Sequence, residues 1–190
     1  MTVDFAAARD NMLESQVRTA DVTDHALQDA IRAVPRETLV APGKAHAAYA
    51  DTEVEYAPGC YLLRPRDIAK LLQALAPKPG ESALAIGAPY AAAVLEAMGL
   101  RVVRQDGEAL SSSPEGRFDL IVSEGAVAEV PASWLAALNT GGRLGVVVRG
   151  GPIGRATVYI NAEDGVGGRP MFDSGAPWLP GFEPKAAFAF

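Results

Sequence analysis

Apolar residues recur three or four positions apart in the first third of the chain, over residues 4–17 and 24–34, and this spacing predicts two helices. Thr23 or Asp24 can cap the second helix, and Pro35 ends it. Residues 41–66 contain several prolines and glycines, so we expect a surface loop with a short extended piece near Tyr61–Leu63. A third helical pattern covers 66–76 and stops at a proline-rich segment.

The pattern then alternates between short apolar runs and helical repeats. Strands are predicted at 82–86, 100–105, 118–123 and 143–148, and helices at 89–98 and 131–138. Residues 156–160 and 169–172 are expected to form a closing hairpin. This alternation predicts an α/β fold with a Rossmann-like, doubly wound, mainly parallel sheet.

We expect one domain over residues 1–190, because 190 residues fit a single core. Its predicted parts are an N-terminal helical arm and substrate-side loop (1–79), a Rossmann-like core (80–150) and a C-terminal β-hairpin with a tail (151–190). The tail is expected to pack Phe188 and Phe190 onto the body.

Composition excludes several classes of protein. The net charge of −6 argues against a nucleic-acid partner. The single cysteine, Cys60, excludes an internal disulfide and is expected to be a small buried side chain. One cysteine and two histidines give no zinc spacing, so we expect no metal. Neither a secretory signal nor a membrane-spanning run is visible, and the cytoplasm is the expected compartment; the oligomeric state stays open.

In a doubly wound sheet, ligands bind outside the carboxyl ends of the strands. Those ends are predicted at 87–89, 105–107 and 123–126. Glu124 follows a strand at this end, and a lone acid there is either a solvated loop residue or a helix cap.

Several blocks, in order, resemble the protein-L-isoaspartate O-methyltransferase family. They include VPRETLV (34–40), LLRPRD (62–67), the strand-turn-helix at 83–99, RFDLIVSEGA (117–126) and NTGGRLGVVV (139–148). The resemblance implies the class I methyltransferase fold, S-adenosylmethionine as the only expected cofactor, and a protein or peptide substrate whose isoaspartyl carboxyl is methylated. Because the donor is activated and the carboxylate is already nucleophilic, such catalysis is mostly alignment.

The resemblance also assigns positions in this chain. Cofactor binding is implied for Gly87, Ala88, Tyr90, Asp106, Ser123 and Gly125. The substrate side is implied for Arg64, Pro65 and Arg66. No catalytic residue is assigned, because the family's serine position is Leu63, whose side chain cannot donate a hydrogen bond to a carboxylate.

Two further departures affect the cofactor side. The glycine-rich loop of the family is here Gly87-Ala88-Pro89, two residues shorter, with a methyl group and a proline where glycines are usual. The chain between this loop and Phe118 is also shorter by about one strand and one helix. Asp106 then matches the family's ribose-binding acid or its later adenine-side acid, or it is an exposed turn residue.

We therefore expect a divergent or degenerate family member. By descent it is a methyltransferase of damaged proteins, with an eroded cofactor loop and activity that is weak or lost. The alternative is a non-catalytic binding or regulatory module that uses the methyltransferase fold.

Overall fold

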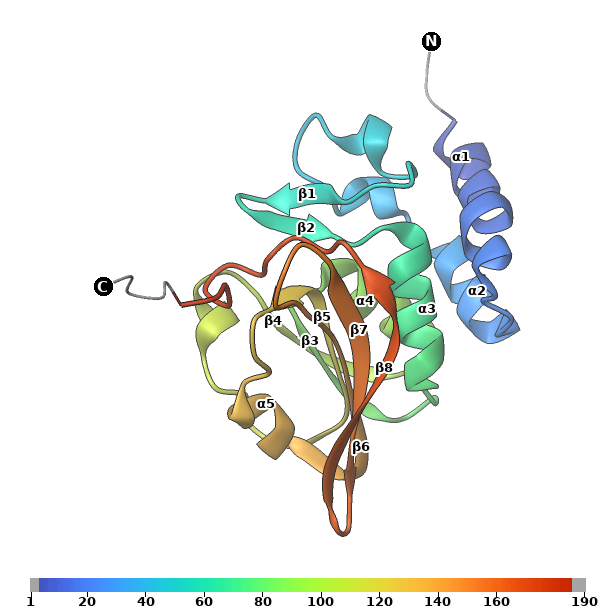
Figure 1. Cartoon of the computed structure of the whole chain (residues 1–190). Coiled ribbons are helices and arrows are strands. Elements are labelled where there is room, and N and C mark those ends of the chain that lie inside the picture. Colours follow the sequence, from blue (N-terminus) through green and yellow to red (C-terminus); the bar gives the residue numbers. More distant parts are fainter. Residues whose placement is uncertain (1–3, 186–190) are drawn as a thin grey trace.

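A computed structural model describes residues 4–185, built around a six-stranded sheet with the order β4-β3-β5-β6-β7-β8 (Figure 1). Its first four strands in this order run parallel, and β7 and β8 are antiparallel. The strands are β3 (Ser82–Ile86), β4 (Arg101–Gln105), β5 (Phe118–Val127), β6 (Leu138–Val148), β7 (Gly154–Ala162) and β8 (Gly165–Ser174). This confirms the predicted mainly parallel, doubly wound sheet and the C-terminal hairpin.

The helices are α1 (Phe5–Met12), α2 (His25–Ala33), α3 (Pro65–Leu75), α4 (Pro89–Ala97) and α5 (Ala132–Ala136). A π-helical turn, Leu13–Val17, continues α1, so the predicted first helix is present at its predicted length. Asp24, one of the two predicted caps, accepts a hydrogen bond from the Leu27 amide at 3.0 Å and begins α2.

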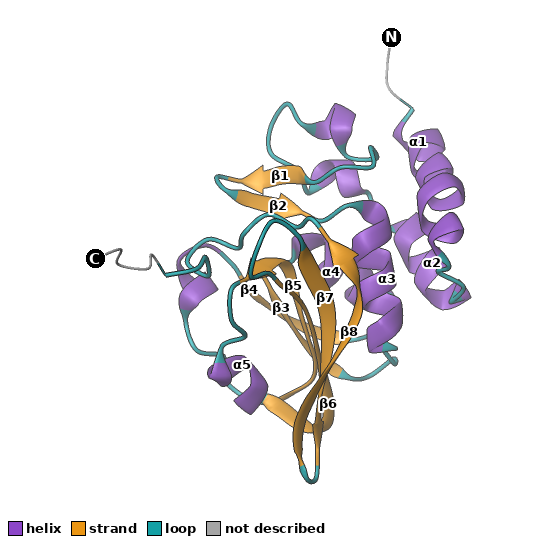
Figure 2. Ribbon diagram, viewed as in Figure 1, coloured by secondary structure: helices purple, strands orange, loops and turns teal. Residues whose placement is uncertain are grey.

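Two apolar layers hold the sheet. Successive side chains of β3 alternate, so Ala83 and Ala85 join the core beneath α2, α3 and α4, while Leu84 and Ile86 join the opposite core. The second layer is covered by α5, whose Trp134 is buried, and by the C-terminal segment. The longer helices thus lie on one side of the sheet (Figure 2).

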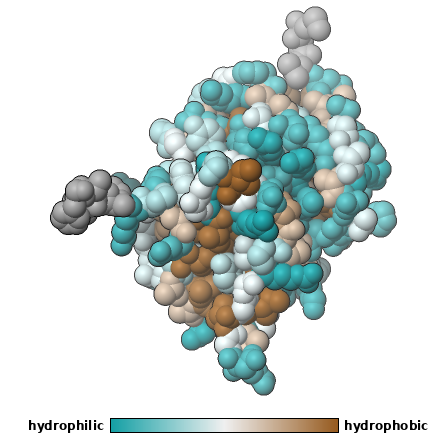
Figure 3. All heavy atoms as spheres, viewed as in Figure 1, coloured by the Kyte–Doolittle hydropathy of each residue, from teal (hydrophilic) through white to brown (hydrophobic). Residues whose placement is uncertain are grey.

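The second layer is the thinner one. Figure 3 shows apolar surface gathered on one face of the molecule. Three of the exposed large apolar side chains, Ile160, Val166 and Met171, lie on β7 and β8.

Four predictions from the sequence need correction or stay open. Residues 41–66 are not wholly a loop, because β1 (Val54–Ala57) pairs antiparallel with β2 (Cys60–Leu62). Cys60 is partly exposed rather than buried, because it lies in this short surface hairpin. The predicted 131–138 helix is confined to α5, because Leu138 already belongs to β6. Phe188 and Phe190 lie outside the described residues.

The path of the chain places the switch point of the sheet, where a ligand crevice is expected, between β3 and β5. From β3 the chain passes through α4 to β4 on one side, and then through a 3-10 turn, Gly107–Ser111, to β5 on the other side. Residues 106–117 form no strand, so β4 is the edge of the sheet, as the predicted loss of a strand and a helix requires. The strand order reverses at β3 and β5, where such folds bind ligands.

Candidate functional site

The turn after β3 is tight. Gly87 has φ +53° and donates its amide to the Gln105 carbonyl at 2.9 Å, and Ala88 leads directly to Pro89, the first residue of α4. Positive φ suits glycine, and proline suits the first turn of a helix. The turn is therefore well formed as a connection, with only two residues between β3 and α4.

Four of the predicted cofactor residues meet at this point. Gly87 continues β3 beside Asp106, which follows β4, and Ser123 pairs with Ile86 across β3 and β5. Gly125 lies two residues further along β5. The registers of the sheet thus place these four residues side by side, as the resemblance implies.

The space above them is filled by the chain itself. A Cβ atom added to Gly87 would lie 2.7 Å from Leu179 Cδ1 and 3.0 Å from Leu110 Cδ1. A Cβ atom added to Gly125 would lie 2.9 Å from Leu179 Cβ. Leu179 is 1% exposed. Its side chain therefore packs onto both glycines at the switch point of the sheet.

Leu179 is held by the segment 176–182, which we call the C-terminal strap. The Ala126 amide donates to the Pro177 carbonyl at 2.7 Å, and the Leu179 amide donates to the Ala126 carbonyl at 2.8 Å. The Ala128 amide donates to the Phe182 carbonyl at 2.8 Å. The C-terminal strap thus follows the end of β5 like a short extra strand (Figure 1).

Glu124 is 1% exposed and bridges three parts of the fold. Its carboxylate accepts the Ala91 amide of α4 at 2.7 Å and the Leu63 amide at 3.0 Å. Burial raises the pKa of this carboxyl, while the Arg36 charge and the backbone amides lower it. Neither of the two alternatives for this acid describes it fully: it is no solvated loop residue, and it accepts an amide of the first turn of α4 from within β5, whereas the N-cap residue of that helix is Ala88.

A bulge in β5 makes this bridge. Four residue steps on β5, from Val122 to Ala126, match only two on β6, from Gly145 to Val147. Bulges redirect side chains next to functional sites. Here the shifted residues are Ser123, Glu124 and Gly125, which places the Glu124 carboxylate under the first turn of α4.

Asp106 is half-buried, and its Oδ1 has no hydrogen-bond partner. Burial raises the pKa of its carboxyl, and the Arg104 charge opposes this. The Tyr56 hydroxyl lies near the same turn, 3.4 Å from a Cβ atom on Gly87, and burial raises its pKa far above the usual range. Asp106 thus lies at the start of the 3-10 turn after β4, but its partial burial shows that it is not an exposed turn acid.

The remaining predicted positions lie elsewhere. Tyr90 is buried in the helical layer, with the Arg36 guanidinium 4.6 Å from its ring centre. Arg64 pairs with Glu53 at 2.8 Å, and Pro65 begins α3. Leu63 is buried, and its amide is already bound to Glu124.

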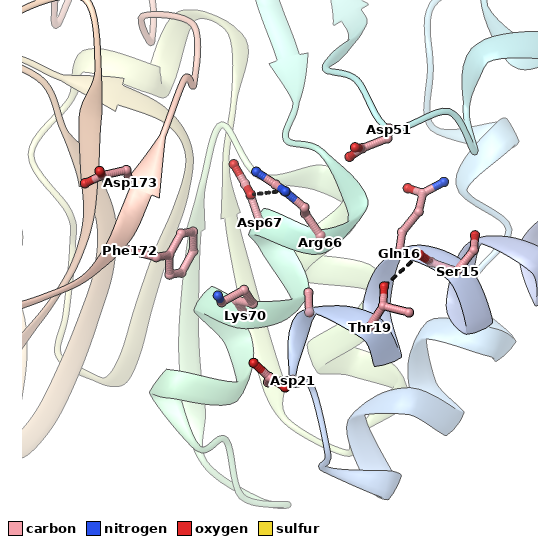
Figure 4. A pocket seen from close by; sticks show the side chains of 11 residues that line it. Ser15, Gln16, Thr19, Asp21, Asp51, Arg66, Asp67, Lys70, Phe172 and Asp173 are labelled. Atoms are coloured by element: carbon pink, nitrogen blue, oxygen red, sulfur yellow. Dashed lines mark hydrogen bonds and ion pairs between the residues drawn. The ribbon is translucent and has the colours of Figure 1, made fainter.

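Arg66 lines a separate cavity of about 360 Å³. Figure 4 shows this cavity between the end of the first helix, α3 and β8, with Arg66 beside Asp67 and with Lys70 near Phe172. Its lining includes neither Gly87 nor Asp106. The predicted substrate side and the predicted cofactor side therefore do not share one open cavity here.

Sequence reasoning missed the C-terminal strap, Leu110 and Arg36. Arg36 is fully buried, and its guanidinium donates to the Ala48 carbonyl at 2.8 Å and to the Leu63 carbonyl at 2.5 Å. No motif signals Leu179, because Pro-Trp-Leu-Pro is an ordinary loop composition. Only the three-dimensional path brings it to Gly87.

Comparison with known proteins decides the family. The model of the protein-L-isoaspartate(D-aspartate) O-methyltransferase family matches residues 7–113, more than half of the chain. A protein-L-isoaspartate O-methyltransferase of Methylorubrum extorquens (strain PA1) is 32% identical, over 90% of this chain and 85% of that protein. One from Methylorubrum populi is 34% identical, over 80% of this chain and 84% of that protein.

The chain belongs to the protein-L-isoaspartate O-methyltransferase family. A solved structure from Plasmodium falciparum, of a protein-L-isoaspartate O-methyltransferase in complex with S-adenosyl-L-homocysteine, has the same fold. Its TM-score is 0.73 at 17% identity, and the match covers 90% of this chain and 97% of that one. The family expected from the sequence blocks and its fold are both confirmed.

Residues 4–185 lack two further structural features. No helix there combines the length and apolarity needed to cross a bilayer. No group of three or more His, Cys, Asp or Glu side chains converges as metal ligands would in the described part of the chain.

Proposed function

We propose that this chain is a family member whose protein carboxyl methyltransferase activity is weak or lost. One observation carries the proposal: Leu179 packs against Gly87 and Gly125, where a ligand of the sheet would lie. By descent its reaction would be methyl transfer to isoaspartyl carboxyls of damaged proteins. S-Adenosylmethionine is the cofactor that this descent implies, and the Plasmodium relative holds the demethylated product of that cofactor.

The residues present do not fit this cofactor in the described conformation. The unpartnered Oδ1 of Asp106 suits a ligand that carries hydroxyl groups. Against this, the space over Gly87 is taken by Leu179 and Leu110, and Pro89 has no amide to donate. The Ala91 amide in the first turn of α4 already binds Glu124, so an incoming carboxylate would meet an occupied donor and a like charge.

The substrate side has changed as well. The position of the family's serine is Leu63, which is buried and offers no side-chain donor. Its amide is bound to Glu124, so the backbone offers no free donor either. A substrate carboxylate would have to be recognised by other groups, such as Arg66 in its separate cavity.

The second candidate is a non-catalytic binding or regulatory module for a protein or peptide partner in the cytoplasm. This candidate is favoured by the contrast between the apolar core and the ligand loop. The apolar core around α3 and β5 is fully packed, whereas the family's ligand loop is shortened and covered. A fold kept intact after loss of its ligand site fits a binding role.

Calorimetric titration with S-adenosylhomocysteine tests the proposal. We expect no saturable heat up to millimolar ligand, because binding must expel Leu179 from a packed position. A methyl-transfer assay with an isoaspartyl peptide should then give no product above background. A micromolar Kd together with peptide methylation would contradict the proposal, and an active family enzyme serves as the positive control.

A further inference from the structure

We infer that the C-terminal strap is an autoinhibitory element, in which Leu179 occupies the crevice between β3 and β5 in competition with ligand. The inference rests on the proposed function, because it names the group that closes the site. It goes further by locating the closure in a segment that can leave without unfolding the sheet.

The occupant is a side chain and not the sheet itself. Leu179 contributes the nearest atoms to both glycines, with Cδ1 toward Gly87 and Cβ toward Gly125. Leu110, from the 3-10 turn, closes the same space from the side of β4. Removal of the Leu179 side chain would therefore widen the space over both glycines, with Leu110 still beside Gly87.

The C-terminal strap is anchored by two buried side chains, Ala176 and Leu179, and by a small set of polar and aromatic contacts. Besides its backbone bonds to Ala126 and Ala128, it is held by Arg149, which donates to the Ala176 carbonyl at 3.0 Å. The Arg149 guanidinium also lies 5.0 Å from the ring centre of Trp178. Phe182 stacks against Trp134, with ring centroids 5.1 Å apart.

These anchors lie at the rim of the sheet and are not part of its ladder of interstrand hydrogen bonds. The C-terminal strap makes only an isolated bridge, between Ala126 and Trp178, whereas β5 pairs along most of its length with β3 and β6. Segments with few backbone bonds open at lower free energy than the core. Displacement of the C-terminal strap by a ligand would thus expose Gly87 and Gly125 while the sheet stays folded.

The test compares S-adenosylhomocysteine binding to the full chain and to two variants. Leu179→Ala removes the Cγ and Cδ atoms that cover Gly87 and part of Gly125, while its Cβ atom stays beside Gly125. This variant is expected to bind about tenfold more tightly than the wild type, because less of the protein is held in the closed state. Arg149→Ala removes anchors without touching the crevice, and a smaller gain of about threefold is expected. Equilibrium dialysis with labelled ligand measures both ratios from the initial slope of bound against free ligand, which requires no saturation of the wild type.

Matched controls separate opening from general loosening. Leu138→Ala deletes the same atoms from the same apolar cluster but at the start of β6, and Arg155→Ala removes an exposed arginine paired with Asp173. Both should bind as the wild type does. Circular dichroism checks that each variant is folded. If Leu179→Ala does not fold, Arg149→Ala still tests the inference.

Hydrogen exchange supplies a second reading. In Arg149→Ala, which keeps Leu179, added ligand should speed exchange at the Leu179 and Ala126 amides, which hold the C-terminal strap to β5, and leave the amides of β3 protected. The inference is overturned if folded Leu179→Ala or Arg149→Ala binds no more tightly than its control, or if Arg149→Ala binds ligand while its Leu179 amide stays protected. A micromolar Kd in the wild type would contradict the proposed function but not this inference. The inference depends on the ratio of the variant affinities to the wild-type affinity.

Discussion

At the scale of single residues, Glu124 explains most about this protein. It follows an apolar strand at the edge where ligands bind, yet its carboxylate is turned inward to α4 and Leu63. The nearby Arg36 is also buried, and burial lowers the pKa of its guanidinium. The charge of Glu124 thus stabilises an internal arrangement, where an acid at the same position of an active site would face solvent.

Glu124→Ala should destabilise the fold by about 3–5 kcal/mol, because it leaves two buried amides without an acceptor and a buried guanidinium without its countercharge. Urea denaturation followed by circular dichroism measures the free energy of unfolding. Glu115→Ala is the control, since Glu115 is exposed and should change stability by less than about 0.5 kcal/mol. Equal effects of the two substitutions would remove Glu124 from this structural role.

At the scale of elements, the turn between β3 and α4 decides what the sheet can hold. Two residues suffice to connect the strand to the helix, and Pro89 fixes the first helical turn. A longer turn with more glycines would stand away from the strand and present its amides to a ligand. The C-terminal strap adds a second barrier at the same place.

Restoring glycines at this turn should therefore not restore binding. We expect the double variant Ala88→Gly with Pro89→Gly to bind S-adenosylhomocysteine no better than the wild type, because the turn remains short and Leu179 remains in place. It should also lose about 1–2 kcal/mol of stability, since both changes increase the freedom of the unfolded chain. Calorimetry gives the affinity, and a micromolar Kd would show that the turn alone closes the site.

The sequence predicted these elements well where local pattern determines them. The strands 82–86 and 101–105, the helix α4 and the closing hairpin follow directly from apolar periodicity and from proline and glycine. Of the β1–β2 hairpin, the sequence predicted only the extended piece at β2, because the two strands have only four and three residues. Such short strands carry too little periodicity to separate them from a loop.

The candidate site was predictable only in part, for a physical reason. Gly87, Asp106 and Gly125 meet because parallel strands align their carboxyl ends, which the strand order alone implies. The contact of Leu179 with Gly87 joins residues more than ninety positions apart and depends on the path of the C-terminal strap. The inward turn of Glu124 depends on a bulge, which no local pattern announces.

At the scale of the whole molecule, the family fold is retained, and we propose that its ligand site is closed. We propose that residues 1–190 act as one domain, because one apolar core joins Met12 of the arm, Leu72 of α3 and Ala176 of the C-terminal strap. The stability of the molecule comes from this shared core. An open ligand crevice would add nothing to the stability of the fold. Packing Leu179 into the crevice therefore stabilises the fold and blocks access of a ligand.

A crystal structure of the wild-type chain grown with millimolar S-adenosylhomocysteine tests the closed crevice most directly. We predict that the electron density will show the Leu179 side chain against Gly87 and Gly125, with no nucleoside between β3 and β5. Density for the ligand over Gly87, with its sugar hydroxyls at Asp106 and the C-terminal strap still bound along β5, would contradict the account.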